Sequence, residues 1–254
     1  MANLFSGVGV ALVTVFGEDG AVDPGSTAKL AADLTGRGVR AVLVCGSTGE
    51  AATLSDGERA SLILAVRAAV PAGIPVIAGT GAPSTRQAVT LTSEAVAAGA
   101  DAVLTWCPRG CQDLVAYFSA VRDAAEGRPA LGYHFPYMPW AQLPVEVLST
   151  LPVAGVKDSS GNPDSLLDEL SHYQGQTYVG SSALLALAGP MGATGALLAL
   201  ANVEPEGCAT AFGGDVGAQR ALAGTHLAVS RGGPAQIKRM LAASSGLSQV
   251  SRLC

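Results

Sequence analysis

The feature that most constrains the fold of this chain is a regular alternation of short, apolar, β-rich segments with helix-like segments. The alternation repeats eight times within about 200 residues, a length that suits a single barrel domain. The short segments are apolar on both faces, which is typical of a parallel sheet covered by helices. We therefore predict a (β/α)8 TIM barrel, with an open doubly wound sheet as the alternative. The predicted strands are 8–15, 39–45, 75–79, 102–106, 129–133, 153–157, 177–180 and 194–200.

Capping residues mark where several predicted helices begin. Asp23 precedes a proline at the first helical position, Ser55 and Glu58 form a capping box, and Ser84 opens a third helix. Two or three helices are expected after the last strand. We therefore divide the chain into a barrel domain, residues 1–203, and a short C-terminal helical extension, residues 204–254.

Charge and composition exclude several classes of protein. The net charge is −5, only 14% of residues are charged, and 49% are hydrophobic, so a largely disordered chain is excluded. No basic stripe is present, so a nucleic-acid partner is not expected. The basic residues are twelve arginines and only three lysines, Lys29, Lys157 and Lys238.

The cysteines predict free thiols. Five cysteines without framework spacing argue against a secreted disulfide scaffold. Cys107 and Cys111 stand four residues apart, but a zinc site would need further ligands, and the chain has only three histidines. We expect neither a metal ion nor a cofactor.

No membrane partner is expected either. The first basic residue is Lys29, so the N-terminal segment does not resemble a signal peptide, and we expect a cytoplasmic protein. Residues 183–201 carry no charge and are long enough to span a bilayer, but Gly189 and Pro190 interrupt them. A buried helix, a turn and a buried strand explain this stretch better.

A lysine at the end of a barrel strand is the first candidate for chemistry. In such barrels the active site lies at the carboxyl ends of the strands, and Lys157 ends the sixth predicted strand. Burial there would lower the pKa of the amine, and a neutral amine can form a Schiff base with a ketone. The alternatives are a lysine that extends to solvent or pairs with Asp158. Lys29 and Lys238 lie in helix-like segments and are predicted to be surface charges.

Two further strand ends carry residues that suit a small α-keto acid. The segment GSTGE (46–50) follows the second strand, and its backbone N–H groups with Ser47 and Thr48 suit a carboxylate, or form an ordinary turn. Tyr133 ends the fifth strand and could relay a proton, or pack as a structural tyrosine. His134 points to the other face of that strand, so its predicted role is structural. Together, the three strand ends describe a site for a carboxylate, a ketone and a proton transfer.

In the same order along the chain, these motifs resemble those of the dihydrodipicolinate synthase and N-acetylneuraminate lyase family. GSTGE (46–50) resembles the family's GTTGE motif, and VIAGTG (76–81) its third strand. Tyr133 with Pro136 matches the tyrosine motif, and GVKDSSG (155–161) matches the Schiff-base lysine motif. The resemblance covers nearly the whole chain and implies a (β/α)8 barrel that acts as a class I aldolase, lyase or dehydratase on pyruvate or another 2-keto acid.

The resemblance also implies a role for each matching residue. Lys157 would form the imine with C2 of the keto acid, and Tyr133 would move protons. Ser47 and Thr48 would bind the carboxylate, Ser47 could also bond the Tyr133 hydroxyl, and the Leu197 carbonyl would face the imine. The partners would be a 2-keto acid and an aldehyde, and the protein would be a homo-oligomer, a dimer or a tetramer.

Two elements of the synthases are missing. Their arginine, five residues after the motif tyrosine, is replaced by Met138, and no tyrosine follows Pro108 before Tyr117. The segment 137–140 therefore predicts a more apolar pocket for the second substrate. The extension after residue 204 is also shorter than usual in the family.

Our main functional hypothesis is a pyruvate-dependent, Schiff-base aldolase or lyase. The alternatives are dihydrodipicolinate synthase itself, a dehydratase of 2-keto-3-deoxy sugar acids, and a non-catalytic keto-acid-binding regulatory protein on the same scaffold.

Overall fold

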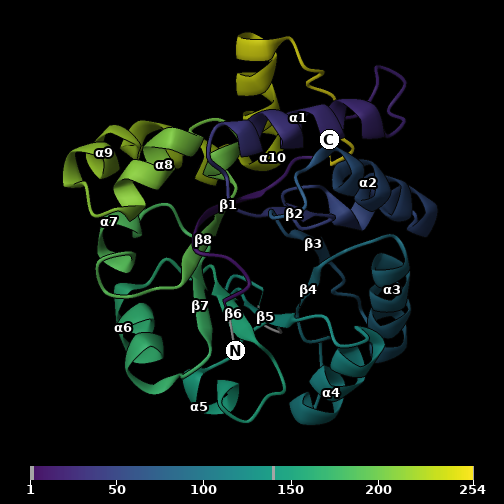
Figure 1. The fold of residues 1–254 in the computed structure, drawn as a ribbon, viewed down its shortest axis with the longest axis vertical. Helices are drawn as coiled ribbons and strands as arrows, with labels where there is room; N and C mark the ends of the chain where they lie inside the picture. Colours follow the sequence, from purple (N-terminus) through teal and green to yellow (C-terminus); the bar gives the residue numbers. More distant parts are fainter. Residues whose placement is uncertain (1–2, 139–140, 254) are drawn as a thin grey trace.

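The computed structural model describes residues 3–138 and 141–253, and within them eight parallel strands close into a barrel in the order β1 to β8 (Figure 1). This confirms the predicted (β/α)8 architecture and excludes the open sheet. The strands are β1 (Gly7–Ala11), β2 (Val42–Val44), β3 (Val76–Gly79), β4 (Ala102–Thr105), β5 (Ala130–His134), β6 (Gly155–Asp158), β7 (Gln176–Val179) and β8 (Gly195–Leu198).

Helices form an outer layer around the barrel (Figure 1). Each of the first seven strands is followed by a helix, and three more helices follow β8. They are α1 (Pro24–Gly36), α2 (Asp56–Ala69), α3 (Thr85–Ala97), α4 (Leu114–Ala124), α5 (Val145–Leu148), α6 (Pro163–His172), α7 (Leu185–Ala188), α8 (Pro205–Phe212), α9 (Val216–Ala221) and α10 (Ala223–Ser245), with short 3₁₀ turns η1 (Ala51–Thr53) and η2 (Leu200–Asn202).

The predicted helix starts are confirmed at three caps. Asp23 accepts a hydrogen bond from the Ser26 backbone, and Ser84 accepts one from Gln87. Ser55 and Glu58 form the predicted capping box, each side chain bonding the other residue's backbone N–H.

The first strand is shorter than predicted, because β1 ends at Ala11 rather than at residue 15. The apolar run continues beyond it, and the Leu12 N–H still donates to the Leu43 carbonyl of β2, but from Val13 onward N–H groups bond side chains. The Val13 N–H donates to Asn202 Oδ1 at 3.1 Å, and the Val15 N–H donates to Thr27 Oγ1 at 3.0 Å. These residues therefore form a buried loop above the barrel.

Close packing of the strands depends on glycine at Gly155 in β6. A Cβ atom there would lie 2.4 Å from the backbone oxygen of Gln176 in β7. The barrel interior is filled mainly by aliphatic and aromatic side chains, among them Leu43, Ile77, Leu131 and Tyr178, so it is a packed core and not a channel.

The uncharged stretch 183–201 forms α7, a turn and then β8, as predicted. Among the residues that the structure describes, no helix is long and apolar enough to cross a membrane.

The C-terminal segment returns to the mouth of the barrel. Helix α10 is kinked at Gly233, where φ is 56° and Pro234 follows. Its second half carries Lys238, and Arg252, further along the chain, pairs with Glu58 in α2. The prediction of a surface charge at Lys238 is wrong: the residue is 1% exposed and pairs with Glu50, which lies far away in the sequence. Lys29 is exposed, as predicted.

Candidate active site

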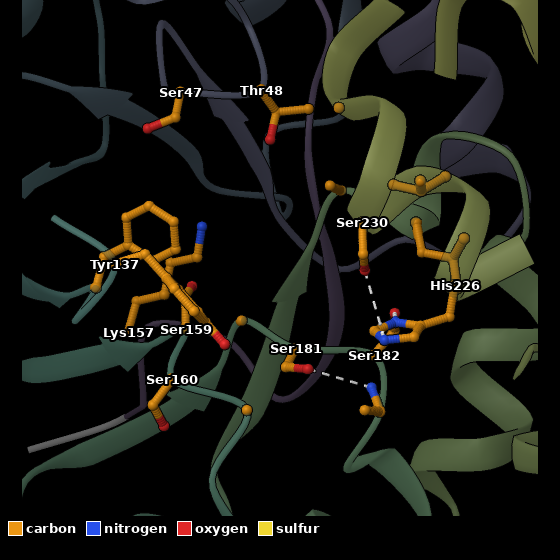
Figure 2. A pocket seen from close by; sticks show the side chains of 18 of the residues that line it. Ser47, Thr48, Tyr137, Lys157, Ser159, Ser160, Ser181, Ser182, His226 and Ser230 are labelled. Atoms are coloured by element: carbon orange, nitrogen blue, oxygen red, sulfur yellow. Dashed lines mark hydrogen bonds between the residues drawn. The ribbon is translucent and has the colours of Figure 1, made fainter. Parts of the chain in front are cut away.

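A pocket of about 690 Å³ opens at the carboxyl ends of the strands. Four predicted site residues line it together: Lys157 in β6, Tyr133 in β5, and Ser47 and Thr48 in the loop after β2. Figure 2 shows the two hydroxyl residues on one side of the pocket, with the amine of Lys157 below them.

Lys157 is a buried amine. The residue is 6% exposed, and burial alone lowers the pKa of its amine from 10.5 to about 8. Asp158 does not pair with it, because adjacent strand residues face opposite sides and Asp158 accepts hydrogen bonds from the Ser160 N–H and hydroxyl, both at 2.7 Å. Both alternatives for this lysine, extension to solvent and pairing with Asp158, are therefore wrong. At a pH slightly above 7, Lys157 can therefore lose its proton and become a neutral amine.

Tyr133 lies directly beside Lys157. The two residues are paired in the β5–β6 register, and the Lys157 nitrogen is 4.8 Å from the centre of the tyrosine ring. Burial raises the pKa of the Tyr133 phenol, while the hydroxyls of Ser159 and Ser47 act in the opposite direction. The phenol is therefore protonated at neutral pH and lies within reach of groups that can exchange its proton.

The loop with Ser47 and Thr48 is held in a compact turn. The Gly49 and Glu50 N–H groups donate to the carbonyls of Gly46 and Ser47 at 3.0 and 3.1 Å. Thr14 Oγ1 donates to the Gly49 carbonyl at 2.7 Å. These bonds fix the backbone from inside the fold and leave the two side chains of the turn facing the pocket.

His134 has structural contacts, as predicted. Its Nδ1 accepts a hydrogen bond from the Leu143 N–H at 2.8 Å, and its Nε2 lies 3.9 Å from Asp158 Oδ1. Leu197 lies in β8 with its side chain fully buried in the barrel interior. It is not among the described residues that line the pocket, whereas its neighbours Ala199 and Leu200 are.

Serine side chains that were not predicted as site residues line the opposite wall of the pocket. Ser159 and Ser160 follow β6, Ser181 and Ser182 follow β7, and Ser230 comes from α10. Two serine pairs placed directly after strand ends were the signal that could have predicted them.

His226 from α10 completes this wall. Its Nδ1 is hydrogen-bonded to Ser182 Oγ at 2.8 Å, and its Nε2 lies 3.5 Å from Ser230 Oγ (Figure 2). Burial lowers the pKa of the His226 ring, so the ring is neutral at pH 7. No sequence pattern around His226 indicated that α10 reaches the barrel mouth.

The expectation of a more apolar second-substrate pocket stays a prediction, because part of the segment 137–140 lies outside the described residues. Tyr137 lines the pocket but is 75% exposed, and Met138 lies in a separate groove beside Trp106. Trp140 lies outside the described residues. Among the described residues that line the pocket there is no aspartate, glutamate or arginine, and Lys157 is the only lysine. The serine pairs that follow β6 and β7 add hydroxyl groups to a wall that also contains apolar side chains such as Leu200 and Val229.

The cysteines Cys45, Cys107, Cys111 and Cys208 are free thiols, as predicted, and Cys254 lies outside the described residues. Across residues 3–138 and 141–253, no group of three or more His, Cys, Asp or Glu side chains is placed to hold a metal ion.

Comparisons with known proteins agree with the resemblance found in the sequence. The model of the dihydrodipicolinate synthetase family matches residues 4–215. The 4-hydroxy-tetrahydrodipicolinate synthase of Pseudomonas savastanoi pv. phaseolicola is 35% identical over 233 residues, which cover 86% of this chain and 80% of that protein. A DapA-like lyase of Halobacterium salinarum is 36% identical over 209 residues, 79% of this chain and 68% of the relative. The synthase of Synechococcus sp. (strain WH7803) is 44% identical over 130 residues, and this match covers 50% of the chain and 43% of the relative, less than half its length.

Solved structures have the same fold. Dihydrodipicolinate synthase from Acinetobacter baumannii, complexed with pyruvate, has a TM-score of 0.86 and 28% identity, covering 98% of this chain and 92% of that chain. The synthase from Aquifex aeolicus has a TM-score of 0.87 and 26% identity, covering 98% and 91%. The matched range, the barrel and the order of its motifs agree, and the chain belongs to the dihydrodipicolinate synthetase family.

Proposed function

We propose that this protein is a class I aldolase-type lyase that makes or breaks a carbon–carbon bond between pyruvate, or another 2-keto acid, and an aldehyde. The observation that carries the proposal is the buried amine of Lys157, whose pKa is about 8, beside Tyr133 and the Ser47–Thr48 turn. The solved structure of a relative from Acinetobacter baumannii holds pyruvate, which supports a keto acid as the ligand.

The reaction begins at the amine. Neutral Lys157 attacks the C2 ketone, and the resulting carbinolamine loses water to form a protonated imine. The imine withdraws electrons, so C3 loses a proton and an enamine forms. In the synthetic direction, C3 of the enamine attacks the aldehyde carbon, and the aldehyde oxygen takes up a proton. Water then hydrolyses the imine, which releases the product and restores the amine.

The neighbouring residues hold the substrate and move protons. Ser47 and Thr48, with the backbone N–H groups of their turn, bind the keto-acid carboxylate. Tyr133 gives a proton to the departing hydroxyl of the carbinolamine and exchanges one with the aldehyde oxygen. The Leu197 carbonyl facing the imine remains part of the proposal on the resemblance alone.

The pocket favours an uncharged, hydroxylated aldehyde as the partner. Its outer wall offers serine hydroxyls and the neutral ring of His226, each of which can both donate and accept hydrogen bonds. A partner with a second carboxylate would find no arginine among the described lining residues. This argues against dihydrodipicolinate synthase itself, although relatives carry that name.

Proton exchange tests the proposed chemistry before the aldehyde is known. The protein should exchange the methyl protons of pyruvate for deuterium in D2O, because the enamine is protonated at C3 by solvent-derived protons. Proton NMR follows the loss of the methyl signal, and Lys157→Met is the control that cannot form the imine. Exchange without consumption of any aldehyde in a panel of charged and hydroxylated aldehydes would favour the keto-acid-binding protein. Loss of water from a 2-keto-3-deoxy sugar acid would favour the dehydratase.

The remaining expectations are a cytoplasmic location and a homo-oligomer. Free thiols suit a reducing compartment. A groove of about 620 Å³ with apolar lining from Trp106, Leu91 and Leu253 supports contact with a second copy. Light scattering coupled to gel filtration measures the assembly, and a monomer at all concentrations would refute the oligomer.

A further inference from the structure

A buried ion pair joins the C-terminal segment to the turn that carries Ser47 and Thr48. Lys238 on α10 donates to Glu50 Oε1 at 2.5 Å, and both residues are 1% exposed. Glu50 is the last residue of the turn, and its N–H donates to the Ser47 carbonyl. The ion pair therefore lies one hydrogen bond away from a proposed substrate-binding residue.

The other carboxylate oxygen of Glu50 binds the C-terminal residues. Glu50 Oε2 accepts hydrogen bonds from Ser251 Oγ at 3.0 Å, the Arg252 N–H at 2.8 Å and the Leu253 N–H at 3.2 Å. Lys238 also donates to the Val250 carbonyl at 2.8 Å. Five hydrogen bonds thus connect this pair to one another and to residues 250–253, and no oxygen of the carboxylate is left without a partner.

A second set of contacts fixes the same residues from outside. The Arg252 guanidinium binds both carboxylate oxygens of Glu58, at 2.6 and 3.1 Å, and donates to the Thr53 carbonyl. Lys238 and Arg252 both lie over the ring of Phe16, at 4.1 and 4.6 Å from its centre. The terminal segment is therefore attached both to Glu50, at the end of the turn, and to Thr53 and Glu58, which follow it.

The turn needs such support because its backbone is strained. Glu50 has a φ of 56°, and Cys45, just before the turn, has a φ of 54°. A residue with a side chain rarely adopts this left-handed conformation, which costs about 1 kcal/mol or more and persists where surrounding contacts enforce it. The contacts on the Glu50 side chain supply that enforcement at one end of the turn.

Charge gives the pair a second effect. A buried carboxylate three residues from Ser47 would repel the carboxylate of a keto acid. The ammonium of Lys238 neutralises it where little water is present to screen the charge.

We propose that Glu50 and Lys238 are positioning residues for keto-acid binding: through them the C-terminal segment holds the Ser47–Thr48 turn in its binding shape and keeps it free of negative charge. The inference rests on the proposed function, because it assumes that the turn binds the carboxylate. It predicts that loss of the pair weakens keto-acid binding while the imine chemistry of Lys157 is retained.

The test measures how much pyruvate is needed to label the full-length protein after reduction with borohydride. We expect Lys238→Met to raise the half-saturating concentration about tenfold or more, the value of one hydrogen bond to a charged group. Labelling at saturating pyruvate should stay complete. Lys29→Met removes an exposed lysine and is the matched control.

A milder variant keeps the test decisive if Lys238→Met does not fold. Ser251→Ala removes one hydrogen bond to Glu50 and should raise the half-saturating concentration about two- to fivefold. Ser248→Ala alters the same segment but removes no hydrogen bond to Glu50, so the half-saturating concentration should stay unchanged. The double variant Glu50→Gln with Lys238→Met removes both charges together and should recover part of the lost affinity.

The outcomes separate the two claims. Folded Lys238→Met or Ser251→Ala protein with the wild-type half-saturating concentration would overturn the positioning role and leave the aldolase proposal intact. A purely structural pair would lower the thermal midpoint without changing that concentration. A wild-type protein that pyruvate never labels would refute the proposed function, and this inference with it.

Discussion

Replacing Lys157 with methionine should make the protein more stable at neutral pH, although it removes the proposed nucleophile. Methionine has a similar length and no charge, so it suits the buried site. Lys157 is 6% exposed, and burial lowers the pKa of its amine to about 8, against 10.5 for an unburied lysine. At neutral pH the folded protein must therefore hold a charged amine away from water.

The size and the sign of the effect follow from these two pKa values. Each pH unit between them corresponds to about 1.4 kcal/mol, so the charged amine costs about 3 kcal/mol below pH 8. Between pH 8 and pH 10.5 the unfolded chain binds a proton that the folded protein has lost, so the cost falls as pH rises. The stability gained by Lys157→Met should therefore be about 3 kcal/mol at pH 7, about 2 kcal/mol at pH 9 and under about 1 kcal/mol at pH 10.5.

Urea unfolding of both proteins at several pH values measures this difference. Groups that titrate in both proteins cancel in the comparison, and Lys29→Met is the control for loss of an exposed lysine, with a change within about 0.5 kcal/mol at every pH. A stability difference between Lys157→Met and wild type that does not vary from pH 7 to pH 10.5 would refute the buried-amine argument.

Three further variants test other parts of the account. Tyr133→Phe should lower the rate of pyruvate deuterium exchange about 10²-fold or more, because the proton-transfer group is lost; a wild-type rate by NMR would exclude that role. Burial raises the pKa of Glu169 to about 8. Between pH 4.5 and pH 8 the unfolded chain releases a proton that the folded protein keeps, so the stability of the wild-type protein should fall over this range. Urea unfolding of Glu169→Gln should not show this fall. Gly155→Ala should destabilise the barrel by about 1–3 kcal/mol, because its Cβ would meet the Gln176 carbonyl, whereas Gly57→Ala, with open space, should be neutral or stabilising; equal midpoints would contradict the packing argument.

Local chemistry made the helix starts and the barrel predictable. The side chains of Ser55 and Ser84 bond backbone groups within three residues, so their signals lie within a short window of sequence. The strand-end rule for barrels then placed Lys157, Tyr133, Ser47 and Thr48 in one pocket, as the structure has them.

Partners that are distant in sequence made the rest unpredictable. Lys238 has the pattern of a surface lysine, but Glu50, 188 residues away, draws it into the core. The apolar run leaves the sheet at Val13, because Asn202, 189 residues away, accepts the hydrogen bond of the Val13 N–H. His226 reaches the pocket because α10, kinked at Gly233, crosses the barrel mouth, which no short pattern specifies.

Trapping of the imine tests the central claim most directly. The protein is incubated with pyruvate, reduced with borohydride, digested, and searched by mass spectrometry for the adduct on each lysine. The account predicts a reduced pyruvate adduct on Lys157, none on Lys29 or Lys238, and no adduct at all in Lys157→Met. Failure of pyruvate and of every other small 2-keto acid to label Lys157 would contradict the Schiff-base mechanism.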